Sequence, residues 1–228
     1  MCNNNGDAQR RALFLELKAK WSGRFSPELG YLRIDRALNN ADAIYKFDIL
    51  KGNDKAGNVE RLLDKNDSFY ATHVGFMISA QDVNKRGKAP LQSYPNAVLF
   101  AGVTGTTAGG IEDLELIYNS EFKLAVGNKN YIAGISTREM RYVPQTQQTS
   151  LTNKSETQSP YDGLMNVGMM CFSGRDDIQV SLNLPTYTAG TLDWKAVTAN
   201  TENVLSFIAL GVLVKGSAQA TTVSDKEV

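Results

Sequence analysis

Cysteine and histidine are almost missing from this sequence. It holds two cysteines, Cys2 and Cys171, and one histidine, His73. Two cysteines so far apart do not make a disulfide framework, and they favour a reducing compartment. A single histidine excludes the common zinc sites that use two or three, and two distant cysteines do not replace them. We therefore expect no metal and no other cofactor.

Net charge and long apolar runs are missing as well. The 24 basic and 24 acidic residues cancel, so the chain lacks the broad positive field of a dedicated nucleic-acid binder. The longest apolar candidate, residues 204–214, is interrupted by Ser206 and Gly211 and falls short of the roughly 20 residues of a membrane span. The first residues show no apolar signal region. We expect no membrane partner and no dedicated nucleic-acid binding.

Recognisable catalytic patterns are also lacking. His73 stands within an alternating segment, where a buried structural role is favoured, and no Gly-x-Ser-x-Gly elbow presents a nucleophile. The stretch 103–111 lacks the Gly-Lys-Ser/Thr end of a phosphate loop, so we interpret it as a connection between strands. Asp64, Asn66 and Asp67 lack the rest of a calcium motif and predict a turn before a strand. The chain is predicted not to be an enzyme.

The N-terminal residues carry the one convincing helical pattern. Asp7 is a suitable N-cap, and Gly23 and Pro27 end the pattern. An apolar stripe with helical spacing is formed by Leu13, Phe14, Leu17 and Trp21. Two interpretations remain open: the stripe packs on the chain's own domain, or the helix is an arm that docks into a neighbouring subunit.

After Gly30 the apolar period changes from helical to two. Alternation predicts strands with one dry and one wet face in segments 43–50, 68–79, 121–126 and 178–184. In the second of these we expect one shared face for Tyr70, Thr72, Val74, Phe76 and Ile78. Segment 203–215 is apolar on both faces, which predicts a central strand covered on both sides.

Turn residues separate the predicted strands. Asn119-Ser120 is expected to be a hairpin turn between 114–118 and 122–126, and residues 127–130 close the next link. Many short strands and one dominant helix predict a mainly β protein, a β-sandwich or jelly-roll-like domain with an N-terminal amphipathic helix.

We divide the chain into three parts. Residues 1–27 form the N-terminal helical arm, 28–216 the β-sandwich domain and 217–228 a flexible C-terminal tail. Within the domain, the polar segment 145–160 has Leu151 as its one aliphatic residue, so it contributes little to a core. It is either a surface excursion or a partner-binding loop.

Five short segments point to a family. They are 45–50, 62–69, 93–96, 117–127 and 141–147. These segments, and more generally residues 33–214, resemble virion proteins of phages that infect Bacteroidetes, including the crAss-like group. The resemblance implies a capsid or capsid-associated β domain present in many copies, without catalytic residues. The chain length favours an auxiliary or minor component.

The leading hypothesis is therefore a virion structural protein that binds other capsid or virion proteins. It implies a homo-oligomer or many-copy assembly, located in the virion after assembly in the host cytoplasm. The predicted interface consists of Leu13, Phe14, Leu17, Trp21, Gln145, Gln147 and Leu151. The alternative is a non-catalytic carbohydrate- or cell-surface-binding β-sandwich module, which the scattered tyrosines and the loop at 103–110 favour. We expect most tyrosines at the rim of the core, with their hydroxyls in water.

Overall fold

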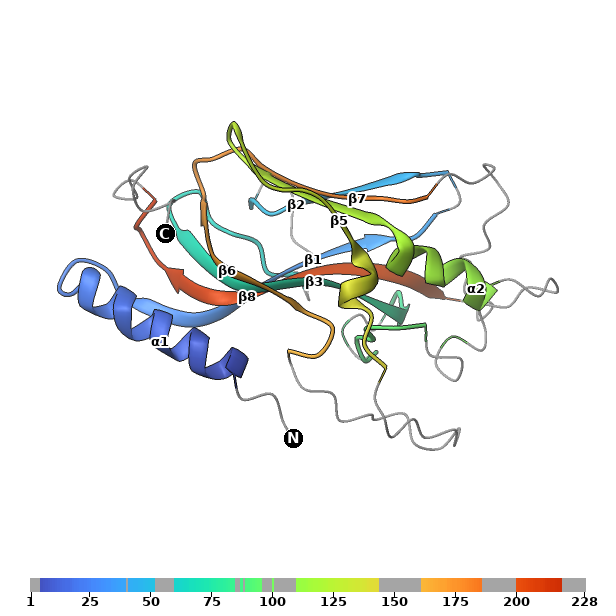
Figure 1. The fold of residues 1–228 in the computed structure, drawn as a ribbon, viewed down its shortest axis with the longest axis horizontal. Helices are drawn as coiled ribbons and strands as arrows, with labels where there is room; N and C mark the ends of the chain where they lie inside the picture. Colours follow the sequence, from blue (N-terminus) through green and yellow to red (C-terminus); the bar gives the residue numbers. More distant parts are fainter. Residues whose placement is uncertain are drawn as a thin grey trace.

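Two four-stranded antiparallel sheets pack face to face, and one long helix lies against the outside of one sheet (Figure 1). The computed structural model describes residues 5–39, 41–51, 60–84, 87, 89–95, 100, 110–143, 161–185 and 200–218. The helices within these ranges are α1 (Asn5–Lys20), α2 (Gly110–Glu115) and the 3-10 helices η1 (Leu116–Asn119) and η2 (Thr137–Met140). The strands are β1 (Pro27–Ala37), β2 (Ile44–Asp48), β3 (Ser68–Asp82), β4 (Glu121–Val126), β5 (Lys129–Ser136), β6 (Met165–Ser173), β7 (Ile178–Asn183) and β8 (Thr201–Val214).

The strand order is that of a jelly roll. Sheet A has the order β1-β8-β3-β6, and sheet B has the order β2-β7-β4-β5. Each strand of the first half pairs antiparallel with one of the second half: β1 with β8, β2 with β7, β3 with β6 and β4 with β5. The chain is thus one long antiparallel ribbon, folded so that successive strand pairs alternate between the sheets. Eight strands connected in this way form a double-sheet jelly roll, which confirms the predicted fold class.

The ribbon reverses direction at the hairpin between β4 and β5. Val126 pairs with Lys129, and Gly127 has a φ of 58° at the first central position of the two-residue turn. A type II′ turn requires this conformation, which glycine adopts without strain. The turn expected within residues 127–130 is therefore confirmed.

The other expected hairpin, at Asn119-Ser120, is wrong. Residues 110–119 form α2 and η1, so no strand precedes this turn. The buried side chains there are Leu114, Ile117 and Tyr118, each 0% exposed. Their spacing of three and four residues is helical, so a helix buries all three on one side.

Strand β3 contains a bulge. Because of it, the residues from Tyr70 to Ile78 that were expected to share one face of the strand do not all share it. Its pairings with β6 and β8 both shift register between Ala71 and His73. One extra residue reverses the direction of every side chain beyond it. Tyr70 consequently faces away from the main core, whereas Val74 faces into it. The expected wet face is also wrong, because twelve consecutive residues from Ser68 onward are buried.

Strand β8 is central, as predicted. It pairs with β1 on one side and β3 on the other. Leu205, Phe207 and Ala209 belong to the main core between the sheets, whereas Val212 and Val214 pack under α1 on the outside of sheet A. Both faces of the strand are therefore covered.

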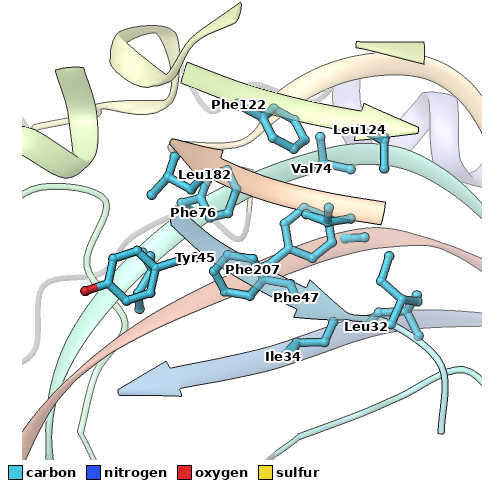
Figure 2. Packing of buried hydrophobic residues seen from close by; sticks show 14 of the residues in the cluster. Leu32, Ile34, Tyr45, Phe47, Val74, Phe76, Phe122, Leu124, Leu182 and Phe207 are labelled. Atoms are coloured by element: carbon cyan, nitrogen blue, oxygen red, sulfur yellow. The ribbon is translucent and has the colours of Figure 1, made fainter. Parts of the chain in front are cut away.

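Four phenylalanines join the two sheets at the centre of the core (Figure 2). Phe76 and Phe207 come from sheet A, and Phe47 and Phe122 come from sheet B. The ring centroid of Phe76 lies 5.4 Å from that of Phe47, 5.1 Å from that of Phe122 and 5.5 Å from that of Phe207. Such aromatic pairs contribute about 0.5–1.5 kcal/mol each beyond their burial.

Truncation of this cluster should destabilise the protein strongly. Phe207 is 0% exposed and lies within ring contact of the three other phenylalanines. We expect Phe207→Ala to lower the free energy of unfolding by about 3–5 kcal/mol, measured by urea denaturation. The control Leu29→Ala, at a side chain that is 50% exposed, should change it by no more than about 0.5 kcal/mol. Equal effects of the two substitutions would show that the cluster does not hold the sheets together.

Candidate interaction surface around helix α1

Helix α1 covers part of the outer face of sheet A (Figure 1). Leu13, Leu17 and Trp21 are 6%, 3% and 5% exposed. They pack in a second apolar cluster with Tyr70, Cys171, Val212 and Val214. The helix therefore packs on its own domain, the first of the two interpretations. The same side chains could meet a neighbouring subunit only if α1 left sheet A.

The start of α1 differs from the expected cap. The helix includes Asn5, so Asp7 lies within its first turn. There the Asp7 carboxylate forms an i,i+4 ion pair with Arg11 at 2.9 Å and accepts a hydrogen bond from the Tyr161 hydroxyl at 3.3 Å. The negative charge still lies near the helix N-terminus, where the helix dipole favours it.

Arg10 clamps the helix to two neighbouring strands. Its Nε donates to the carbonyl oxygen of Gly211 in β8 at 2.9 Å, and its Nη2 donates to that of Gly30 in β1 at 2.7 Å. Gly30 and Gly211 are partners in the β1–β8 ladder. Hydrogen bonds from a guanidinium are stronger than those between neutral groups. One side chain therefore fixes the position of α1 across the β1–β8 seam.

Further polar contacts hold α1 to β6. Asn166 Nδ2 donates to Gln9 Oε1 at 2.7 Å, and Gln9 Nε2 donates to the Gly168 carbonyl at 3.2 Å. A Cβ atom at Gly6 would lie 2.8 Å from the Tyr161 ring, so the helix approaches this ring more closely than a larger residue would allow. The docking of α1 combines an apolar stripe with a set of directed hydrogen bonds.

His73 lies beneath this clamp. It is 5% exposed, its Nδ1 lies 3.0 Å from the Thr72 hydroxyl, and its ring meets the Tyr161 ring edge-on at 5.0 Å. Burial, and secondarily the positive charge of Arg10, lowers the pKa of His73 below its usual value. Burial under α1 therefore favours the neutral imidazole over the charged form, in agreement with the buried role expected for His73.

Of the other predicted interface residues, Phe14 packs against the same apolar cluster. Phe14 is half-buried and lines a cavity of about 250 Å³ together with Phe25 and the turn that follows α1. Gln145, Gln147 and Leu151 lie outside the described residues. The predicted interface therefore stays a prediction, with only its α1 part placed in the structure.

Along the described strands of sheet B, the outward side chains are exposed or half-buried. A shallow hollow of about 430 Å³ at its edge is lined by Glu121, Asn183 and Ser136 among others. The Glu121 carboxylate accepts hydrogen bonds from Lys123 at 2.8 Å and Asn183 at 3.2 Å. These bonds, with that to Lys123 the stronger, lower the pKa of the Glu121 carboxyl. The charged group in this hollow, the Glu121 carboxylate, is therefore already bound by Lys123 and Asn183.

The suspected calcium-like stretch is a structural turn. Asp64 Oδ1 accepts from the Asn66 amide at 3.0 Å, and Asp67 Oδ1 accepts from the Gly216 amide at 2.8 Å. The turn comes directly before β3, as expected. The first two residues of the predicted tail, Ser217 and Ala218, are buried beside it, and Ala218 donates to the Asn66 carbonyl at 3.0 Å.

The tyrosines are more buried than expected. Four of them are at most 3% exposed and belong to the interior, namely Tyr45, Tyr70, Tyr94 and Tyr118. Tyr118 shows why: its hydroxyl donates to the Gln92 carbonyl at 3.1 Å, so a buried partner replaces water. Among the described tyrosines, the exposed ones are Tyr31 and Tyr142, at 42% and 38%. The expected rim position is therefore wrong for these four.

Metal sites and membrane-spanning helices are two other features considered for the described part of the chain. Groups of three or more histidine, cysteine, aspartate or glutamate side chains arranged to hold a metal ion are not found there. Helices long and apolar enough to cross a membrane are likewise not found in that part of the chain.

The fold and the α1 surface together define the class of this protein as a jelly-roll β-sandwich with a helix docked on its outer face. Comparisons with protein-family models, curated proteins and solved structures each find no match to the chain.

Loss of the arginine clamp should loosen α1 selectively. We expect Arg10→Gln to lower the free energy of unfolding by roughly 1.5–3 kcal/mol, the usual contribution of hydrogen bonds to a charged group. Hydrogen exchange should show a larger loss of amide protection in α1 than in β8. The control is Arg11→Gln, because Arg11 is 72% exposed and its i,i+4 pair contributes only about 0.3–0.5 kcal/mol. Unchanged α1 protection in the Arg10 variant would contradict the clamp.

The buried histidine should make stability depend on pH. Because the pKa of His73 is lowered in the folded state, the unfolded state binds more protons below about pH 6.5. Stability is therefore complete above that pH and falls as the solution is acidified, by at most about 1.4 kcal/mol per pH unit for one proton. Unfolding free energies of the wild type and His73→Gln should converge on acidification. Parallel curves for the two proteins would refute this role.

Proposed function

We propose that this protein is a non-enzymatic virion structural protein, an auxiliary or minor capsid component present in many copies. The single observation that carries the proposal is the strand order β1-β8-β3-β6 and β2-β7-β4-β5. Double-sheet jelly rolls with this construction are a recurrent architecture of viral capsid domains. The proposal also draws on the resemblance suggested by the sequence of residues 33–214 to virion proteins of phages that infect Bacteroidetes.

The distribution of surface groups supports assembly. The formal net charge is zero, so copies of the chain do not repel one another over long distances. Large exposed apolar side chains lie on different elements: Leu15 on α1 is 63% exposed, Leu29 on β1 is 50% exposed and Ile44 on β2 is 51% exposed. A subunit inside an assembly needs contacts on more than one side, and symmetric repetition makes weak contacts effective.

The proposal assigns α1 a particular place. Its apolar stripe packs within the subunit and is not available to a neighbour. Two other parts of the helix are available: the outward side, where Leu15 is exposed, and the cavity beside Phe14. No α1 residue belongs to the main core cluster. The sandwich body can therefore form without the helix, while neighbour contacts depend on it.

The direct test is the composition of phage particles. Quantitative mass spectrometry of purified particles should find the chain in many copies, and antibodies against it should label the particle surface or its openings. A chain that is abundant in infected cells but absent from washed particles would refute the virion role.

Deletion of residues 1–22 should separate folding from assembly. The truncated chain keeps the main core, so circular dichroism should still show the β-sandwich, with lower stability because Tyr70 and Val212 lose their cover. It should not be incorporated into particles when it is the only copy supplied. Leu15→Glu is the matched point variant, because it changes only the outward side of the docked helix. Normal incorporation of both variants would contradict a role of α1 in assembly.

The alternative, a carbohydrate- or cell-surface-binding module, has one observation in its favour. Jelly rolls also occur as lectin domains, and Tyr31 and Tyr142 expose aromatic rings to solvent. Reproducible binding on a glycan array that is lost in Tyr31→Ala or Tyr142→Ala would favour this function.

A further inference from the structure

A small pocket opens beside β1, close to the start of β3. It has a volume of about 240 Å³ and is lined by Gly30, Tyr31, Leu32, Lys51, Arg61, Leu62, Asp64, Asp67, Phe69 and Leu213. Leu32 and Phe69 are 2% and 0% exposed and supply an apolar interior, whereas the charged residues are more accessible. The volume lies below the roughly 300–1,000 Å³ of small-molecule sites, so the pocket suits one side chain.

Two cations at this pocket have no counter-charge among the residues that the structure describes. Arg61 and Lys51 are both exposed, and neither forms an ion pair with a carboxylate in the described part of the chain. The Arg61 guanidinium lies 5.3 Å from the centroid of the Tyr31 ring. A guanidinium stacked on an aromatic ring still has its N–H edge available for a planar, two-pronged contact with a carboxylate.

Backbone hydrogen bonds fix the two residues that carry these cations. The Arg61 amide donates to the Arg33 carbonyl at 2.8 Å, and the Arg33 amide donates back at 3.0 Å. The Lys51 amide donates to the Leu63 carbonyl at 2.8 Å. Both residues are thus attached to the sandwich by hydrogen bonds of strand type. A pre-organised site loses less conformational entropy when it binds a ligand.

The two carboxylates at the pocket are already in use. Asp64 and Asp67 each accept a backbone N–H, from Asn66 and Gly216 respectively, and no ion pair joins them to Lys51 or Arg61. These bonds hold the turn before β3 and the chain that follows β8. The unmatched charge at the pocket is therefore positive, and a negatively charged group from outside would satisfy it.

We propose that this pocket binds the carboxylate of a glutamate or aspartate side chain that a neighbouring polypeptide supplies. Arg61 holds the carboxylate with its N–H edge, Lys51 adds a second positive charge, and Phe69 contacts the apolar part of the inserted side chain. The exposed Leu29 and Tyr31 lie two residues apart on β1 and contact the flanking residues of the partner. The site goes beyond the virion role, because binding in solution requires no particle.

The test is an NMR titration of the full-length chain. The probe is a short capped peptide with one glutamate between two valines, and the matched probe has glutamine in place of the glutamate. We expect the amide signals of Tyr31, Arg61 and Phe69 to shift with the glutamate peptide only. Raised ionic strength should weaken the binding, because the charges involved are exposed.

Variants identify the residues responsible. Arg61→Gln should weaken binding roughly ten-fold, as the loss of a charged hydrogen-bonding partner does, and Lys51→Gln should weaken it less. Lys65→Gln removes the same charge at a neighbouring exposed position outside the pocket lining and should leave binding unchanged. Equal binding of the two peptides, or unchanged binding by Arg61→Gln, would overturn the proposal.

The chain's own acidic residues provide a further comparison. Asp225 and Glu227 follow the last described residue, Ala218, which is anchored beside the pocket at Asn66. Binding of the peptide should be the same in the wild type and in the double variant Asp225→Asn, Glu227→Gln. Binding that occurs only in the double variant would show that the chain fills its own pocket and would overturn a partner in trans. Particle composition is measured separately, so failure of this site and failure of the virion role are distinguishable.

Discussion

Close packing of aromatic rings between the two sheets is the constraint on which the rest of this structure depends. Phe76 and Phe207 from sheet A must meet Phe47 and Phe122 from sheet B, which fixes the register of β3 and β8 with respect to β2 and β4. Once Phe207 faces inward, alternation turns Val212 and Val214 outward. An apolar outer face needs a cover, and α1 supplies it. Helix α1 is therefore needed because β8 has an apolar outer face in addition to the face that it buries in the main core.

The bulge in β3 allows one strand to contribute side chains both to the main core and to the cluster under α1. Phe69 and Val74 both belong to the main core, although their positions in the sequence differ by an odd number. A regular strand would point them to opposite faces, so one residue must be added between them. The same insertion places Tyr70 and His73 on the outer face, under α1 and its polar clamp. Core packing and helix docking therefore depend on one irregularity.

The pattern of apolar residues predicts the sheets well because burial imposes a period of two on each strand. It predicts the central position of β8, whose two apolar faces need cover on both sides. It does not predict the bulge, since an added residue is visible only once the partner strands are in register. It also misses the clamp by Arg10, because backbone carbonyls leave no trace in the sequence. It also wrongly favours a strand at 114–118, where the spacing of Leu114, Ile117 and Tyr118 is helical and α2 and η1 form.

The two apolar clusters differ in how they oppose local opening. The main core draws residues from both sheets, so no single element can leave without breaking the whole interior. The cluster under α1 depends on Leu13 and Leu17 of the helix, on Trp21 directly after it, and on hydrogen bonds from Gln9 and Arg10. Elements with few buried contacts open at lower free energy than the global unfolding transition. Helix α1 can therefore open at lower free energy than the jelly roll beneath it unfolds.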